Sequence, residues 1–141
     1  MPTKIINKTK LLQWVAQLKV TPVVAILFSH DCLSAIDEAV ALELDGQIVA
    51  VACLAPSGED MSGQPSIISL YTLKAHRHKG YGRMVLKAAI ARCTERGFPQ
   101  VRYDTLSEAE ERIIESLPPE ERALLVVHEH ERLFDEFMFV E

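Results

Sequence analysis

The sequence of 141 residues predicts one domain of the mixed α/β class that spans residues 1–141. One observation is a β-hairpin, in which two Val-rich runs flank Asp45-Gly46, a pair that supplies the positive φ angles of a type I′ turn. Another is a strand, helix and strand succession between Ser66 and Leu106, because a crossover of helix length joins parallel strands. The length itself is that of one domain.

The N-terminal quarter is predicted to be helical. Apolar residues recur at helical spacing over residues 9–19, and Pro22 ends that helix. Residues 23–28 are too few and too uniformly apolar to be assigned to a buried strand or to a helix, and a short helical turn is expected over residues 31–35. No motif in the first 38 residues indicates a function.

The remaining elements follow from turn and cap residues. Gly97 is a natural left-handed stop for a long helix. Ser107 and Glu110 have the spacing of a capping box, so a second helix begins there and ends before Pro118. The expected elements are strands at 39–44, 47–54, 66–73, 101–106, 123–128 and 133–140, helices at 82–96 and 107–117, and a polar loop at 56–65.

Composition and cysteine content narrow the class of protein. The chain is 48% hydrophobic and 25% charged, which is ordinary for a globular protein. No apolar run approaches the roughly 18 residues that span a bilayer, and the N-terminus has no secretory pattern, so we expect a cytoplasmic protein without a membrane partner. Cys32, Cys53 and Cys93 contain no C-x-x-C pair, which indicates reduced packing residues rather than a metal site.

Charge is distributed unevenly along the chain, whose net charge is -5. Residues 61–94 contain no Asp or Glu, and six cations lie among them: Lys74, Arg77, Lys79, Arg83, Lys87 and Arg92. We call these six residues the basic island. Residues 104–141 hold twelve acids and three arginines, a balance of -9. The first region is expected to attract anions and the second to attract cations.

The turn before the long helix carries the clearest chemical signal. Its sequence is Arg77-His78-Lys79-Gly80-Tyr81-Gly82-Arg83, after a predicted strand and at the start of a predicted helix. The first backbone N–H groups of a helix have no intrahelical partner, and glycine lets a ligand approach them closely. The helix dipole and the neighbouring cations add positive potential. The pattern therefore predicts a phosphate or pyrophosphate site, and it lacks the Gly-x-x-x-x-Gly-Lys-Ser/Thr of a Walker loop.

The motif and its surroundings resemble the GNAT superfamily of N-acetyltransferases. R-x-x-G-x-G is complete at Arg77, Gly80 and Gly82, and the order of elements from the hairpin to Val140 also follows the family, over about 100 residues. The resemblance implies a mostly antiparallel sheet with a central splayed pair of parallel strands and helices on both faces. It also implies acetyl-CoA, or another acyl-CoA, as co-substrate and an amine as acceptor, with transfer by direct attack.

The resemblance also assigns binding roles. Backbone amides around Lys79, Gly80, Gly82 and Arg83 would hold the CoA pyrophosphate, within a cofactor-binding segment that includes Arg77, His78 and Tyr81. Main-chain groups of Leu70 and Thr72 would pair with the pantetheine arm as an added strand would. A backbone N–H on the splayed strand would stabilise the oxyanion that forms when the amine attacks the thioester.

Two features typical of the family are absent. Ser107 stands at the Asn-like position, and Ile114 or its neighbour stands at the position of the Tyr that protonates the leaving thiolate. Ser66-Ile67-Ile68-Ser69 stands where a carboxylate is usual. Four residues remain as candidates for proton handling: Tyr71 and Tyr103 as acids, and Glu43 and Asp104 as bases acting through water. Each also has an ordinary interpretation, as packing for the tyrosines and as a solvated surface group for the carboxylates.

Several alternatives stay open. The missing groups fit a domain that binds acyl-CoA but catalyses weakly, and the basic island fits a polyanion or nucleic-acid partner, although the acidic total and few aromatics disfavour nucleic acid. His128 and His130 alternate with glutamates but give only two ligands, so no metal is expected. Trp14 is core or a lid over the acceptor. Asp135 and Glu136 favour a cationic acceptor, and a homodimer is an option that the family implies.

Overall fold

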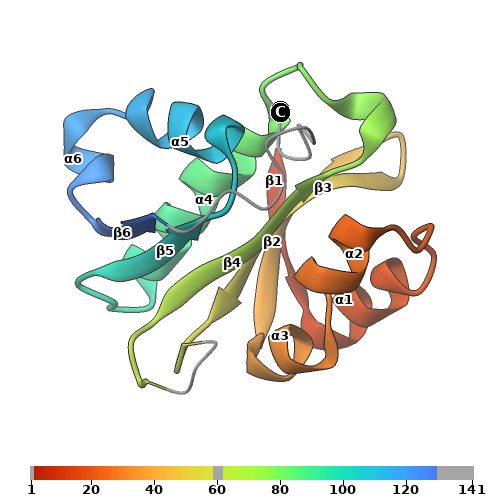
Figure 1. Cartoon of the computed structure of the whole chain (residues 1–141), viewed down its shortest axis with the longest axis horizontal. Coiled ribbons are helices and arrows are strands. Elements are labelled where there is room, and N and C mark those ends of the chain that lie inside the picture. The colour runs from red at the N-terminus through yellow and green to blue at the C-terminus, as the bar shows by residue number, and fades with distance from the viewer. Residues whose placement is uncertain (1, 59–61, 130–141) are drawn as a thin grey trace.

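The computed structural model describes residues 2–58 and 62–129, which form a six-stranded sheet in the order β1-β2-β3-β4-β5-β6 (Figure 1). The strands are β1 (Thr3–Asn7), β2 (Glu38–Leu44), β3 (Gln47–Ala55), β4 (Ser66–Thr72), β5 (Val101–Thr105) and β6 (Leu125–Glu129). The helices are α1 (Lys8–Val15), α2 (Pro22–Leu27), α3 (His30–Ala35), α4 (Tyr81–Glu95), α5 (Glu108–Glu115) and α6 (Pro119–Arg122), with a 3₁₀ turn, η1 (Lys74–His76).

The sheet changes direction at its centre. Strands β1 to β4 are antiparallel neighbours, whereas β5 is parallel to β4 and β6 is parallel to β5. The predicted hairpin is confirmed, because Asp45 and Gly46 have φ angles of 50° and 79°, as a type I′ turn requires. The mixed sheet with a central parallel pair, predicted from the sequence, is therefore confirmed.

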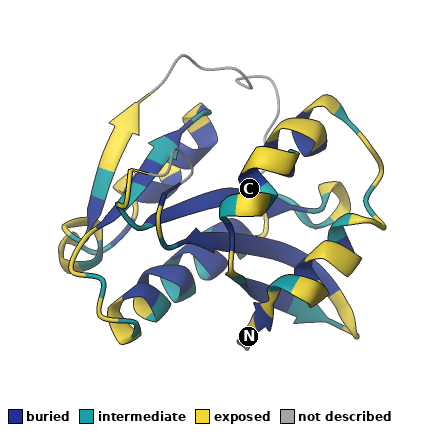
Figure 2. Cartoon of the chain, turned by 90° about the horizontal axis from the view of Figure 1, so that it is seen from below, coloured by how far each residue is buried: buried dark blue, intermediate teal, exposed yellow. Residues whose placement is uncertain are grey.

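The helices cover both faces of the sheet. Helices α1, α2 and α3 lie on one side, and α4 with α5 lies on the other (Figure 1). Helix α4 packs across β2, β3 and β4, and residues such as Val85, Leu86 and Ala89 bury its inner stripe. The strands β3 and β4 are buried along almost their whole length (Figure 2), so the central part of the sheet is the core of the fold.

The N-terminal segment differs most from the expectation. Residues 3–7 form the edge strand β1, which the sequence analysis did not predict, since only pairing with β2 stabilises this short segment. Residues 23–28 could not be assigned from the sequence, and the structure forms α2 over Pro22–Leu27. Thr21 Oγ1 accepts the Val24 N–H at 3.2 Å and Pro22 occupies the first turn, so this proline begins a helix after the predicted one has ended.

The C-terminal elements follow the cap and turn residues. Ser107 Oγ accepts the Glu110 N–H at 3.3 Å and α5 begins at the next residue, as the capping spacing predicted. The short helix α6 was not predicted, and it starts with Pro119 in its first turn. Strand β6 was predicted, but the final strand at 133–140 lies outside the described residues.

The three cysteines fit their interpretation as packing residues. Cys32, Cys53 and Cys93 are buried and none is in a disulfide. Burial raises the pKa of the Cys93 thiol to about 11 and raises that of Cys53 further, so these thiols stay protonated at neutral pH. Within the described ranges, no helix has the length and apolar character needed to cross a membrane.

Candidate functional site

The parallel strands β4 and β5 diverge. They share one paired position, Ser66 with Arg102, where the Arg102 N–H also donates to the Pro65 carbonyl at 2.8 Å. Strands β5 and β6, by contrast, pair along the whole of β5, from Val101 to Thr105. A wedge-shaped gap therefore opens between β4 and β5 toward their C-terminal ends. Along that gap no strand from the described residues lies beside the backbone of β4.

A β-bulge bends β4 beside this gap. Ser69 and Leu70 together lie opposite one β3 residue, Ala52. Ser69 has a φ of 55°, a left-handed conformation that is uncommon for a residue with a side chain. Its hydroxyl donates to the Leu27 carbonyl at 2.6 Å and so fastens the bulge to the end of α2. The bulge thus turns β4 away from the course that would pair it with β5.

The backbone of Thr72 faces the gap. The Leu73 N–H donates to the Val49 carbonyl at 2.8 Å, so the neighbouring Ala50–Thr72 pair is of the kind that exchanges no hydrogen bonds. The N–H and carbonyl of Thr72 therefore point away from β3. This is the orientation that the resemblance requires of Thr72 if it is to pair with a pantetheine arm.

The turn before α4 has the geometry of an anion site. His78 and Gly80 both have left-handed φ angles, 65° and 80°, and Gly80 is the N-cap of α4. Tyr81, Gly82 and Arg83 follow as the first helical residues, and their N–H groups belong to the set that a helix leaves without intrahelical acceptors. Successive N–H groups in such a turn make a concave anion site. We call residues 78–83 the amide turn.

Arg77 holds the two parts of the site together. Its Nε donates to the Thr72 carbonyl at 3.0 Å, and its guanidinium lies 5.6 Å from the centre of the Tyr71 ring. Tyr71 in turn makes edge contacts with Trp14 at 6.4 Å and Phe28 at 5.9 Å. The Arg77 side chain therefore points toward β4. Its positively charged guanidinium contacts Tyr71 and Thr72, on the strand beside the gap.

The other cations of the basic island are largely engaged elsewhere. Arg83 donates to the hydroxyl and carbonyl of Ser116, Lys87 lies 3.7 Å from Glu121, and Arg92 binds Glu38 and Glu95. Lys79, within the amide turn, and Lys74, in η1 before it, are exposed. Lys87 and Arg92 are thus paired with carboxylates, which reduces the positive charge available to a polyanion.

The Tyr103 hydroxyl forms a hydrogen bond with a buried carboxyl group. Its hydroxyl donates to Glu110 Oε1 at 2.7 Å, and Glu110 Oε2 accepts from the Leu106 N–H at 2.8 Å and the Ser107 hydroxyl at 3.1 Å. Burial raises the pKa of Tyr103 well above its usual value and also raises that of Glu110. This placement favours the packing interpretation of Tyr103, because a hydroxyl so held does not reach a ligand in the gap.

The two candidate bases lie apart. Glu43 forms an ion pair with Lys4, which lowers the pKa of the carboxyl group and makes it a weaker base. Asp104 is on β5 beside the gap and accepts from Arg102 Nε at 3.0 Å. Ile114, which the resemblance puts at or next to the family's acid position, is buried. Of the four sequence candidates, Tyr71, Tyr103 and Asp104 are on the strands that border the gap, and the Tyr103 hydroxyl is bound to Glu110.

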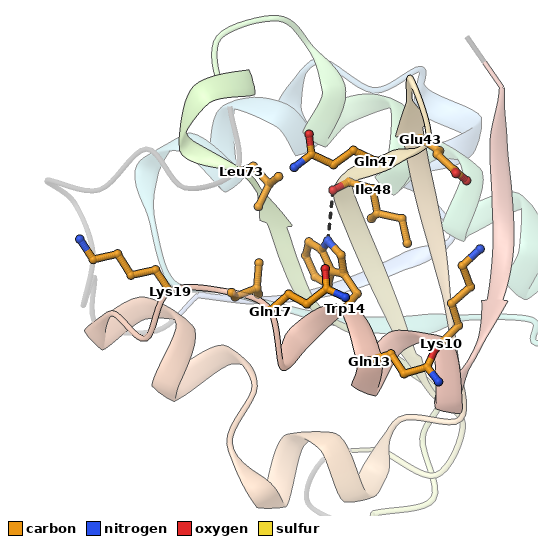
Figure 3. A pocket seen from close by; sticks show the side chains of 11 residues that line it. Lys10, Gln13, Trp14, Gln17, Lys19, Glu43, Gln47, Ile48 and Leu73 are labelled. Carbon is orange, nitrogen blue, oxygen red and sulfur yellow. Dashed lines mark hydrogen bonds between the residues drawn. The ribbon is translucent and has the colours of Figure 1, made fainter.

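A separate pocket lies on the face that α1 covers (Figure 3). It has a volume of about 440 Å³, and Trp14 at its centre donates from Nε1 to the Ile48 carbonyl at 3.1 Å. Trp14 is therefore a core residue whose ring also forms a pocket wall. The lining residues are Lys10, Gln13, Trp14, Gln17, Leu18, Lys19, Glu43, Gly46, Gln47, Ile48 and Leu73.

Some features of the site were not found from the sequence. Ser69 carries no pattern that marks a bulge, because its left-handed backbone becomes visible only through the pairing of β3 with β4. The buried carboxyl of Glu110 was predicted as a cap, and the Ser107-x-x-Glu110 spacing was its only signal. Within the part of the chain that the structure describes, no group of three or more His, Cys, Asp or Glu side chains is placed to hold a metal ion.

Comparison with known proteins gives one family match and several similar solved structures. The family model described as Acetyltransferase (GNAT) family matches residues 10–113. A search of curated proteins finds no significant match. The fold is similar to that of a ribosomal-protein-alanine N-acetyltransferase from Brucella melitensis biovar Abortus 2308, at 16% identity and a TM-score of 0.49, over 72% of this chain and 77% of that one. It is also similar to a predicted acetyltransferase from Clostridium acetobutylicum, solved with acetyl-CoA, at 15% identity and a TM-score of 0.46, over 71% of this chain and 77% of that one.

The gap between β4 and β5 and the amide turn both lie within the residues that the family model matches. The family match covers well over half of the chain, so the protein belongs to the GNAT acetyltransferase family. Membership of this family indicates acyl transfer as the general class of reaction.

Proposed function

We propose that the protein is an acyl-CoA-dependent N-acyltransferase that transfers the acetyl group of acetyl-CoA to a primary amine. The observation that carries the proposal is the juxtaposition of the gap between β4 and β5 with the amide turn at the start of α4. The turn suits a pyrophosphate, and the gap leaves the backbone of Thr72 facing an extended ligand.

Binding would use the main chain more than side chains. The N–H groups of the amide turn would hold the pyrophosphate of CoA, with the exposed Lys79 adding positive potential at its rim. The pantetheine amides would lie along Leu70 and Thr72 in the manner of an added strand. The Thr72 carbonyl already accepts from Arg77, so a second donor would use its other lone pair.

The chemical step is a direct transfer. The neutral amine nitrogen attacks the thioester carbonyl carbon, the oxygen becomes an oxyanion, and the tetrahedral intermediate collapses as the carbon–sulfur bond breaks. The amine loses one proton and the CoA thiolate gains one, so the products are an amide and free thiol. A backbone N–H at the bulge of β4 would stabilise the oxyanion. Asp104, through water, and the Tyr71 hydroxyl are the groups proposed to help move the protons.

A second candidate is a domain of the same family that binds acyl-CoA with little or no transfer. The observations that favour it are the engagement of Tyr103 by Glu110 and the ion pair that weakens Glu43 as a base. Both leave the described part of the site with few groups for proton transfer. The second candidate shares the binding geometry of the first and differs only in turnover.

The proposal also covers the acceptor, the cellular location and the oligomeric state. The acid-rich residues 104–141 support a cationic amine acceptor, although Asp135 and Glu136 lie outside the described residues. The proposal also includes a cytoplasmic location and a homodimeric state.

The deciding experiment is isothermal titration with acetyl-CoA and, beside it, free CoA, followed by a panel of primary amines. Micromolar binding with amide product and free thiol supports the transferase. Micromolar binding without product across polyamines, aminoglycosides and lysine peptides supports the binding domain. The absence of binding at both low and physiological salt contradicts both candidates.

A further inference from the structure

We propose that the pocket beneath α1 is a second ligand site, separate from the acyl-CoA gap, for a small polar molecule that carries a carboxylate or phosphate group. Its volume of about 440 Å³ is within the range of small-molecule sites. Its walls come from α1 and residues 17–19 after it, from the hairpin between β2 and β3, and from Leu73 after β4 (Figure 3).

The pocket is separated from the gap by a strand. Its sheet residues belong to β2 and β3, whereas the gap opens on the opposite edge of β4, toward β5. Tyr71 also stands between the two, because its ring contacts Trp14 on the pocket side and Arg77 on the side of the amide turn. A ligand in this pocket would therefore not occupy the acyl-CoA gap.

The charge of the pocket favours an anion. Glu43 is the one acid among the lining residues, and Lys4 already pairs with it. Lys10 and Lys19 then supply positive charge on opposite sides of Trp14 (Figure 3). The neighbouring Lys4 lowers the pKa of Lys10 because the two cations repel each other. A bound anion near Lys10 would relieve that repulsion.

The rest of the lining suits a polar carbon skeleton. Three carboxamides, those of Gln13, Gln17 and Gln47, each offer a donor and an acceptor to hydroxyl groups. Beneath them Trp14 and Ile48 provide an apolar floor, and the indole N–H is already bonded, so the ring is fixed in place. Fixed apolar walls with a few polar groups are the usual composition of a small-molecule site.

Trp14 makes the proposal testable, because it is the only tryptophan in the chain. Citrate and glucose 6-phosphate would be titrated at constant ionic strength, with glucose as the neutral comparison, and indole fluorescence and the ¹H–¹⁵N signal of the indole would be followed. We expect saturable changes with one or both anions and little change with glucose. Lys10→Gln and Lys19→Gln should each weaken anion binding about fivefold. Lys8→Gln should not weaken it, because Lys8 is on the same helix as Lys10 but outside the pocket lining.

Three results would overturn the second site. They are no saturable change with either anion, equal affinity for glucose, and anion affinity that Lys10→Gln and Lys19→Gln leave unaltered. Competition provides a further arm: saturating acetyl-CoA should leave anion binding at the pocket, and full displacement would place the anion in the acyl-CoA gap. The anion titration does not depend on acyl transfer, so its failure is distinct from failure of the proposed function.

Discussion

Arg77 Nε lies 3.0 Å from the Thr72 carbonyl oxygen, and this bond links the motif before α4 to the strand that borders the gap. Removing the guanidinium would free the end of β4 and expose the face of Tyr71. We expect Arg77→Ala to weaken acetyl-CoA binding about tenfold, as loss of one hydrogen bond from a charged donor implies. Arg77→Lys should recover little of it, because an ammonium lacks the planar fork. Isothermal titration measures both, and unchanged affinity in Arg77→Ala contradicts the role.

Gly80 is required by its backbone conformation as well as by its position. Its φ is 80°, and a Cβ there would meet no atom within 4 Å, so substitution strains the backbone without a clash. We expect Gly80→Ala to lower the free energy of unfolding by about 1 kcal/mol and to weaken acetyl-CoA binding. Gly97→Ala is the matched control, because Gly97 has a φ of 82° at the other end of α4 with equally open space. Equal effects of the two substitutions on acetyl-CoA binding would show that the amide turn is not part of the binding site.

The beginnings and ends of elements were predictable wherever a single residue decides them. Asp45 and Gly46 fix the hairpin turn, Gly97 ends α4, and Ser107 begins α5, because each acts through local backbone geometry. The R-x-x-G-x-G motif likewise located the turn before α4. These features need no knowledge of which strands are neighbours.

What could not be predicted depends on long-range pairing. The edge strand β1 is stabilised by its pairing with β2. The Ser69 bulge forms because β3 places one residue opposite two residues of β4. The hydrogen bond from Tyr103 to Glu110 spans only seven residues of sequence, but it depends on how α5 packs against β5. A strand sequence by itself does not encode its pairing partners, and without the position of α5 it does not distinguish a packing tyrosine from a catalytic one at Tyr103.

The buried carboxyl of Glu110 should make stability depend on pH. Its pKa in the folded state is raised by burial, so the native state retains a proton that the unfolded chain has released. Relative to Glu110→Gln, the wild-type protein should therefore lose stability as the pH rises from about 4 through the folded-state pKa. Urea unfolding at several pH values measures this difference. Glu115→Gln, at an exposed position of the same helix, should show no such trend.

An ion-pair cluster should stabilise the contact between α4 and β2. Glu38 binds Arg92 at 2.8 Å and Arg96 at 3.2 Å, and its side chain is 16% exposed. Glu95 binds the same Arg92 at 3.3 Å but is 65% exposed. We expect Glu38→Ala to lower the melting temperature by about 5 °C and Glu95→Ala by about 1 °C. A thermal scan in which Glu95→Ala is the more damaging would contradict the assignment.

Ser69 combines a strained backbone with a buried hydrogen bond, and substitutions can separate the two. Ser69→Ala keeps the left-handed φ of 55° and leaves the Leu27 carbonyl without its donor, so it should cost about 1–3 kcal/mol of unfolding free energy. Ser69→Gly loses the same bond but relieves the strain, so it should be less destabilising than Ser69→Ala by about 1 kcal/mol. Because the bulge directs β4 away from β5, both should weaken acetyl-CoA binding. Chemical denaturation and titration measure the two effects, and a Gly variant less stable than the Ala variant would show that strain at this bulge is not a significant cost.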